Sequence, residues 1–152
     1  RDDSQEISVS HEFSPGVVPI DVVTGDYNGD GVVDVAFAGP DGARVFLGRG
    51  DATFEDGLVL TPQIGDKELN LRHSGDLDGD GEDELIAILV GNLEDNDLVA
   101  IDGVVSEPTV LELEAREYYP TTAATDLNND GIPDFALHRG RTVNLSLLVS
   151  NP

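Results

Sequence analysis

Three short segments of the sequence place oxygen-bearing side chains at every second position. They begin at Asp26, Asp76 and Asp126 and share the pattern Asp-x-(Asp or Asn)-x-Asp-Gly-x-x-(Asp or Glu). This spacing brings several side-chain oxygens to one side of a tight loop. Hard oxygen donors of this kind suit Ca²⁺, which takes about six to eight oxygens in a flexible geometry. Mg²⁺ suits them less well, because it requires a stricter octahedron and keeps more of its water.

Each of these nine-residue segments, called loops 1, 2 and 3 below, is predicted to hold one calcium ion. Side-chain oxygens would come from positions 1, 3, 5 and 9, and a backbone carbonyl oxygen from position 7. The predicted ligands are Asp26, Asn28, Asp30, Val32 and Asp34 in loop 1, Asp76, Asp78, Asp80, Glu82 and Glu84 in loop 2, and Asp126, Asn128, Asp130, Ile132 and Asp134 in loop 3. Carboxylates this close repel one another unless a cation neutralises them. We expect loop 2, the most charged, to depend most on metal.

Two alternatives compete with this interpretation. An EF-hand loop opens with a similar pattern, but it needs a Glu at position 12 and flanking helices. Position 12 is apolar here (Phe37, Ala87 and Leu137), and the flanks have the composition of strands. Asp-Gly and Asn-Gly pairs are also common in metal-free hairpin turns. Three copies in one register, each with an acidic residue at position 9, favour calcium over plain turns.

The loops are the most regular part of an internal repeat. Their first aspartates are 50 residues apart each time, a period in the range of four-stranded propeller blades. We predict an all-β fold in which residues 1–152 form one β-propeller-type module of three repeats, with the ring incomplete within one chain. The predicted parts are a surplus N-terminal strand within 1–14, repeat 1 at 15–64, repeat 2 at 65–114, and repeat 3 at 115–152, which lacks its last strand.

Short apolar runs bounded by turn residues locate the strands of each repeat. The predicted strands are Glu6–Phe13, Pro19–Thr24, Val35–Ala38, Ala43–Leu47, Gly57–Leu60, Leu69–Ser74, Glu84–Val90, Leu98–Asp102, Thr109–Leu113, Thr121–Thr125, Asp134–His138 and Thr142–Val149.

These loops, each followed by an apolar strand, resemble the FG-GAP/VCBS repeats of integrin α-subunit propellers and many bacterial surface proteins. The segment Val45–Phe54 is similar to that family's V-x-L-G-x-G-D-G-T-F stretch, with Ala52 in place of a glycine. The resemblance implies a calcium-bearing β-propeller whose metal ions act as structural clips between strands. It also implies a role among adhesion modules, lectins, surface scaffolds and non-catalytic parts of polysaccharide-degrading enzymes.

Composition excludes several classes of function. The chain has 31 acidic and 8 basic residues, for a formal charge of −23. Binding to nucleic acid through phosphate neutralisation requires clustered Lys and Arg, so we predict no nucleic-acid partner. No apolar run approaches the roughly 18 residues that span a bilayer, so we predict no membrane insertion. There is no cysteine to form a disulfide, a thiolate metal site or a nucleophile. No catalytic constellation emerges, and we predict that the chain is not an enzyme.

We therefore expect a secreted, calcium-stabilised module at the cell surface, with a binding, adhesion or scaffold role and a protein or glycan ligand. One alternative is a lectin-like, non-catalytic part of a polysaccharide-acting enzyme, with Tyr118, Tyr119 and Arg116 as a candidate sugar surface. Another is a surface-layer or filament subunit. The chain begins at Arg1 rather than Met, so we expect a processed form or an excerpt of a longer propeller. Exchange of the N-terminal strand between copies would instead give an oligomer or filament.

Two short motifs match known recognition or modification sequences, but each lies where the repeat needs a turn or a strand. Arg49-Gly50-Asp51 matches an integrin-recognition tripeptide, but it falls where the repeat needs a turn. Asn144 begins a glycosylation sequon inside a predicted strand.

Overall fold

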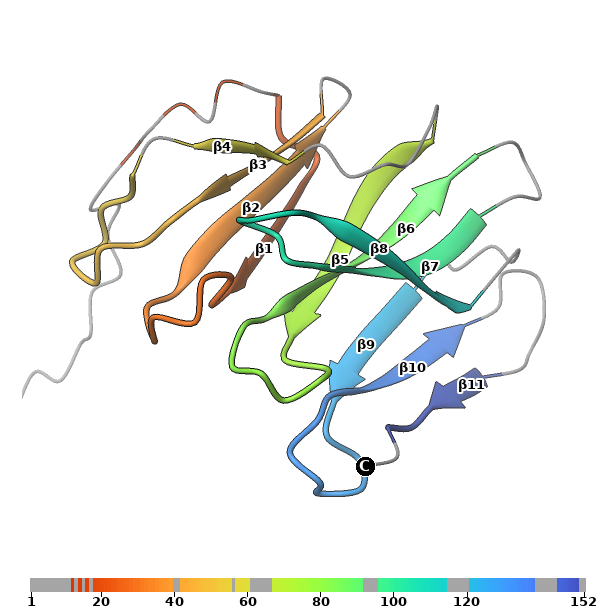
Figure 1. Cartoon of the computed structure of the whole chain (residues 1–152). Coiled ribbons are helices and arrows are strands. Elements are labelled where there is room, and N and C mark those ends of the chain that lie inside the picture. The colour runs from red at the N-terminus through yellow and green to blue at the C-terminus, as the bar shows by residue number, and fades with distance from the viewer. Residues whose placement is uncertain are drawn as a thin grey trace, which may run out of the picture.

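The computed structural model describes residues 12, 14, 16, 18–39, 42–55, 57–60, 67–91, 96–114, 121–138 and 145–150. Within these residues the chain forms strands in three antiparallel sheets and no helix (Figure 1). This part of the chain therefore has no helix that is long and apolar enough to cross a membrane.

The strands of each sheet are consecutive in the chain, and each sheet is an antiparallel meander. Sheet 1 contains β1 (Asp21–Gly25), β2 (Asp34–Gly39), β3 (Gly42–Phe46) and β4 (Leu58–Leu60). Sheet 2 contains β5 (Glu68–Gly75), β6 (Glu84–Val90), β7 (Asn96–Asp102) and β8 (Thr109–Glu114). Sheet 3 contains β9 (Thr121–Thr125), β10 (Asp134–His138) and β11 (Leu145–Leu148). No sheet closes on itself, so the structure confirms an all-β fold without confirming a propeller.

The strands predicted from Pro19 onward are all present, and where both ends fall in the described residues they agree with the prediction to within two residues. The predicted N-terminal strand Glu6–Phe13 lies almost wholly outside the described residues. Residues 142–144 of the predicted strand Thr142–Val149 also lie outside the described residues, and β11 (Leu145–Leu148) forms in the rest of it.

Each acidic loop joins the first strand of its sheet to the second. The pairs that close the three loops are equivalent, namely Gly25 with Asp34, Gly75 with Glu84 and Thr125 with Asp134. All three loops therefore lie at the same end of their sheets, which is the lower end in Figure 1. The 50-residue repeat of the sequence is thus a repeat of one local structure.

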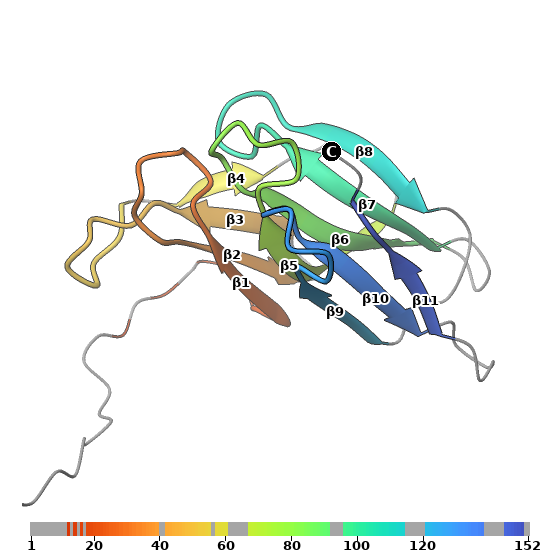
Figure 2. The ribbon, with the colours of Figure 1, turned by 90° about the horizontal axis from the view of Figure 1, so that it is seen from below.

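Sheet 2 lies between the other two sheets (Figure 2). On β6, Leu85 and Ala87 pack toward sheet 1, whereas Ile86 and Ile88 pack toward Phe135 and other residues of sheet 3. Every residue from Glu84 to Leu89 is consequently buried. This double burial explains why the strand is a continuous apolar run rather than an alternating one.

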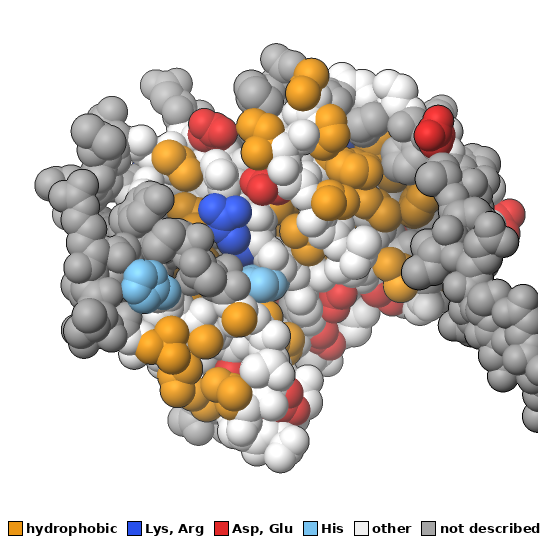
Figure 3. Space-filling model, turned by 180° about the vertical axis from the view of Figure 1, so that it is seen from behind, with side chains coloured by type: hydrophobic (Ala, Val, Ile, Leu, Met, Phe, Trp, Pro, Cys, Tyr) orange, Lys and Arg blue, Asp and Glu red, His pale blue; other side chains and the backbone are white. Residues whose placement is uncertain are grey.

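The two outer faces of the stack keep exposed apolar side chains. Val22 of sheet 1 is 60% exposed and Leu147 of sheet 3 is 55% exposed. Their neighbours Ile20 and Leu145 are also exposed. Figure 3 shows hydrophobic side chains gathered in two areas, over sheet 1 on the right and over sheet 3 at the lower left. Among the described residues, apolar side chains are therefore exposed on the outer sides of both sheet 1 and sheet 3.

Candidate metal centre

The aspartates of each loop first act on the loop's own backbone. The position-1 carboxylate accepts a hydrogen bond from the position-6 glycine, with distances of 2.7 Å for Asp26–Gly31, 3.1 Å for Asp76–Gly81 and 3.0 Å for Asp126–Gly131. The position-5 carboxylate accepts from the position-7 amide, at 2.8 Å in loops 1 and 2 and 2.9 Å in loop 3. The position-6 glycines have φ between +79° and +94°, a left-handed conformation that side chains rarely adopt. The acidic pattern thus specifies the turn as well as the candidate ligands.

The position-9 carboxylates are the buried members of the set. Asp34 and Asp134 are 0% exposed and Glu84 is 2% exposed. One oxygen of each accepts the amide of position 2, at 2.9 Å from Tyr27, 2.6 Å from Leu77 and 2.6 Å from Leu127. This contact ties the end of the loop back to its start.

The second oxygen of the position-9 residue differs between the loops. In Asp34 it accepts the Gly48 amide at 2.8 Å. In Asp134 it accepts the amide and the hydroxyl of Ser150, at 2.7 and 2.8 Å. Among the described residues, Glu84 receives no such second donor, so one of its oxygens is left for another partner.

The position-9 carboxyl groups of the three loops differ in pKa, because they receive different numbers of hydrogen bonds. Burial raises the pKa of Glu84 to about 7, against the Leu77 amide, and nearby Asp78 adds to the rise. Burial also raises the pKa of Asp34, although the Gly48 and Tyr27 amides oppose it. Burial acts in the same sense on Asp134, but its hydrogen bonds from Ser150 and Leu127 outweigh burial and lower the pKa. Of the three position-9 carboxyl groups, Glu84 is therefore the one whose ionised form burial disfavours most.

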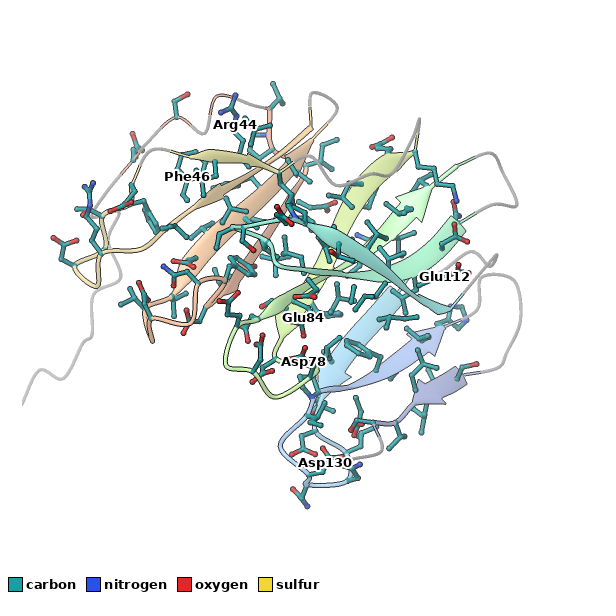
Figure 4. All side chains as sticks on the ribbon, viewed as in Figure 1. Arg44, Phe46, Asp78, Glu84, Glu112 and Asp130 are labelled. Atoms are coloured by element: carbon teal, nitrogen blue, oxygen red, sulfur yellow. The ribbon has the colours of Figure 1, made fainter. Side chains whose placement is uncertain are left out.

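Loop 2 also brings three predicted ligands together. One carboxylate oxygen each from Asp76, Asp78 and Glu84 lie within 4.8 Å of one another, and Figure 4 shows Asp78 and Glu84 in this loop. Two oxygens on opposite sides of a calcium ion, each at about 2.4 Å, are about 4.8 Å apart. The donor type and the spacing of this cluster fit Ca²⁺. Asp80 lies in the same loop, with one oxygen bonded to the Glu82 amide.

Loops 1 and 3 have the same backbone but a different side-chain arrangement. The position-3 amide group donates to the position-5 carboxylate, at 3.0 Å for Asn28–Asp30 and 2.7 Å for Asn128–Asp130. Across the described ranges, the loop 2 cluster is the one acidic group with three oxygens this close. All the predicted ligands of the three loops, including the position-7 carbonyls of Val32, Glu82 and Ile132, stay predictions.

Three residues with clear roles around the loops were not among the predicted ligands. Gly48 and Ser150 hold position-9 carboxylates from later in the chain, and the sequence spacing differs between them. Asp83, at position 8 of loop 2, bonds to loop 1. Position 8 is Val33, Asp83 and Pro133 in the three loops, so no shared residue type marks it.

The segment that contains Arg49-Gly50-Asp51 forms a tight turn, closed by a bridge between Gly48 and Phe54. The amide and hydroxyl of Thr53 donate to the Asp51 carboxylate, at 3.0 and 2.6 Å. These hydrogen bonds lower the pKa of Asp51. These contacts are those expected if Arg49-Gly50-Asp51 forms a turn of the repeat. The candidate sugar surface (Tyr118, Tyr119 and Arg116) and the sequon at Asn144 lie outside the described residues.

Comparison with protein families matches residues 26–87 to the FG-GAP-like repeat. The matched segment contains loops 1 and 2 and ends within β6. Neither the curated proteins nor the solved structures gave a match.

Proposed function

Because the chain contains an FG-GAP-like repeat segment, we propose that it is an extracellular, calcium-stabilised β-propeller-type module. Its three acidic loops would each bind one Ca²⁺ as a structural clip. Its role would be binding, adhesion or scaffolding, with a protein or glycan ligand and no catalysis. Extracellular calcium sites bind weakly, with Kd on the order of 10⁻⁴–10⁻³ M, and this range matches the calcium levels outside cells.

The observation that carries the calcium proposal is the three-oxygen cluster of Asp76, Asp78 and Glu84. Its support comes from recurrence, because loops 1 and 3 repeat the hydrogen bonds of positions 1, 5 and 9. Glu84 adds an energetic reason, since its pKa is raised to about 7. A cation beside it would relieve the cost of its ionised form.

The propeller proposal is supported by the way the sheets stack. Sheets 1 and 2 are four-stranded meanders, and each core lies between two neighbouring sheets. Equivalent faces meet at both junctions. Ala36 of sheet 1 packs toward sheet 2, and Ile86 of sheet 2, which lies 50 residues later in the chain, packs toward sheet 3. Stacking of this kind is what successive propeller blades require.

Thermal melting tests the calcium proposal. With about 5 mM Ca²⁺ present, well above the expected Kd, the melting temperature should lie above that in a chelator, because binding to the native state raises stability. The Asp78→Ala variant should lose part of this difference, because Asp78 belongs to the cluster and is otherwise exposed. A melting temperature that does not respond to calcium would contradict structural calcium.

A structural role as a filament or surface-layer subunit is a second candidate, favoured by the apolar outer faces of sheets 1 and 3. Each face resembles one half of an internal junction, so a second copy offers the matching half. Association of this kind is heterologous, and it closes into a ring or extends into a filament according to its rotation. Exchange of the N-terminal strand, proposed from the sequence, would act on residues outside the described part.

A further inference from the structure

We infer that calcium binding at loops 1 and 2 is cooperative and that loop 3 binds independently, with Asp83 as the positioning residue that couples the first two. This inference rests on the proposed calcium function and adds a rule for how the sites interact. It follows from contacts between loops rather than from the ligands of any one loop.

Two hydrogen bonds join Asp83 to Asp26, the first predicted ligand of loop 1. The Asp26 amide donates to Asp83 Oδ2 at 3.0 Å, and the Asp83 amide donates to the Asp26 carbonyl oxygen at 2.7 Å. The bonds therefore fix both backbone polar groups of Asp26. Its carboxylate remains within loop 1, bonded to Gly31.

The two loops also touch at a second point. A Cβ atom added to Gly29 of loop 1 would lie 3.3 Å from Glu82 Cγ and 3.4 Å from the Gly81 carbonyl oxygen of loop 2. The neighbouring strands add a third link, because the Ser74 hydroxyl donates to the Thr24 carbonyl oxygen at 2.5 Å. Loops 1 and 2 thus meet at two points, and the strands before them at a third.

Loops 2 and 3 lack this connection. The residue equivalent to Asp83 is Pro133, which has neither an amide hydrogen nor a carboxylate. Its ring packs against Gly75, and among the described residues no hydrogen bond joins the two loops. A Cβ at Gly79, the counterpart of Gly29, would meet nothing within 4 Å.

The coupling follows from the position of Asp83 in its own loop. It lies between Glu82 and Glu84, both predicted ligands, so filling loop 2 restricts the backbone on either side of Asp83. A restricted Asp83 holds Asp26 in place and reduces the ordering that loop 1 still needs for binding. The effect is reciprocal, because coupling between two binding equilibria acts equally in both directions.

The experiment follows one amide in each loop during a calcium titration of the whole chain. Gly31, Gly81 and Gly131 are equivalent, since each donates to the position-1 carboxylate of its own loop. Their ¹H–¹⁵N resonances therefore report the three sites separately. Gly31 and Gly81 should shift together with a Hill coefficient above 1, and Gly131 should follow its own curve.

Removing one ligand tests the direction of coupling. Asp78→Ala, in loop 2, should move the Gly31 midpoint to calcium concentrations at least about 5-fold higher, the lower end of typical coupling, and leave Gly131 unchanged. The matched control is Asn128→Ala, the same position in loop 3, which should leave Gly31 unchanged. An unmoved Gly31 midpoint in Asp78→Ala would overturn the coupling.

Two substitutions at Asp83 separate coupling from simple structural support. Asp83→Pro gives loop 2 the residue that loop 3 carries. Gly31 and Gly81 should then both still respond to calcium, but the midpoint of Gly31 should no longer depend on whether loop 2 is filled. Asp83→Asn keeps an acceptor oxygen and the backbone amide, so in this variant Gly31 and Gly81 should still shift together, as in the unsubstituted chain. If Asp83→Pro does not fold, Asp78→Ala still decides the question. If none of the three glycines responds to calcium, the proposed function itself fails, which is a different outcome from three independent responses.

Discussion

Gly75 lies where sheets 2 and 3 meet, and the structure leaves no room there for a side chain. A Cβ atom at this position would be 2.5 Å from Cγ of Pro133, 3.4 Å from its Cβ and 3.6 Å from its Cδ. Carbon atoms pack best at about 3.5–4.0 Å, so in Gly75→Ala the proline ring must move by about 1 Å or more. We expect the substitution to loosen the junction between the two sheets.

The expected cost is that of overpacking a well-fitted contact, about 1–3 kcal/mol. A smaller gain opposes it, because alanine reduces the freedom of the unfolded chain by about 0.4–1 kcal/mol. The free energy of unfolding should therefore fall by roughly 1–2 kcal/mol. Urea denaturation with calcium present measures this change, provided that the slope of the transition stays constant.

Pro133→Ala supplies the control for this prediction. It removes Cγ and Cδ of the ring and leaves only the Cβ atom, at an ordinary van der Waals distance from an alanine at position 75. In the Pro133→Ala background the cost of Gly75→Ala should therefore disappear and leave only the gain of about 0.4–1 kcal/mol, and the double-mutant cycle should give a coupling of about 1 kcal/mol or more. An equal cost in both backgrounds would show that the clash with Pro133 is not the cause.

Three further predictions concern other parts of the molecule. Because burial raises the pKa of Glu84 above its ordinary value to about 7, the calcium-free protein should lose roughly 1–3 kcal/mol of stability as pH rises from about 4.5 to about 7. Glu84→Gln should remove most of this loss in chemical denaturation with chelator present, and the smaller rise in the pKa of Asp34 should account for what is left. Ala52 adopts a φ of 66°, so Ala52→Gly should raise the free energy of unfolding by about 0.5–1 kcal/mol in urea denaturation, and an unchanged value would argue against strain. The filament candidate predicts that Val22→Asp and Leu147→Asp are each monomeric in light scattering but form a 1:1 dimer when mixed, whereas a self-dimer of either variant would exclude this head-to-tail mode.

The strands could be predicted because their signals are local. The continuous apolar run of β6 indicates burial on both faces, and the structure places it between two sheets. The loop pattern likewise predicts its own turn, since positions 1, 5, 6 and 7 bond within nine residues of one another. For these features the sequence neighbours are also the structural neighbours.

The contacts between repeats could not be predicted in the same way. Gly25 resembles an ordinary turn glycine, but its backbone lies against the next sheet, and a Cβ there would be 2.7 Å from Asp83 Oδ2 and 2.8 Å from Ser74 Oγ. The donors Gly48 and Ser150 reach their carboxylates at separations of 14 and 16 residues. Each of these contacts depends on how sheets and hairpins pack, and no single segment of sequence specifies that.

The amount of calcium bound per chain tests the central claim most directly. Isothermal titration calorimetry of the whole chain, supported by equilibrium dialysis because binding on the order of 10⁻⁴–10⁻³ M is weak, gives this number. The three loops predict three calcium ions per chain, with one lost in Asp78→Ala and one lost in Asn128→Ala. Absence of saturable calcium binding at millimolar concentrations, or a stoichiometry unaffected by these two substitutions, would contradict the account.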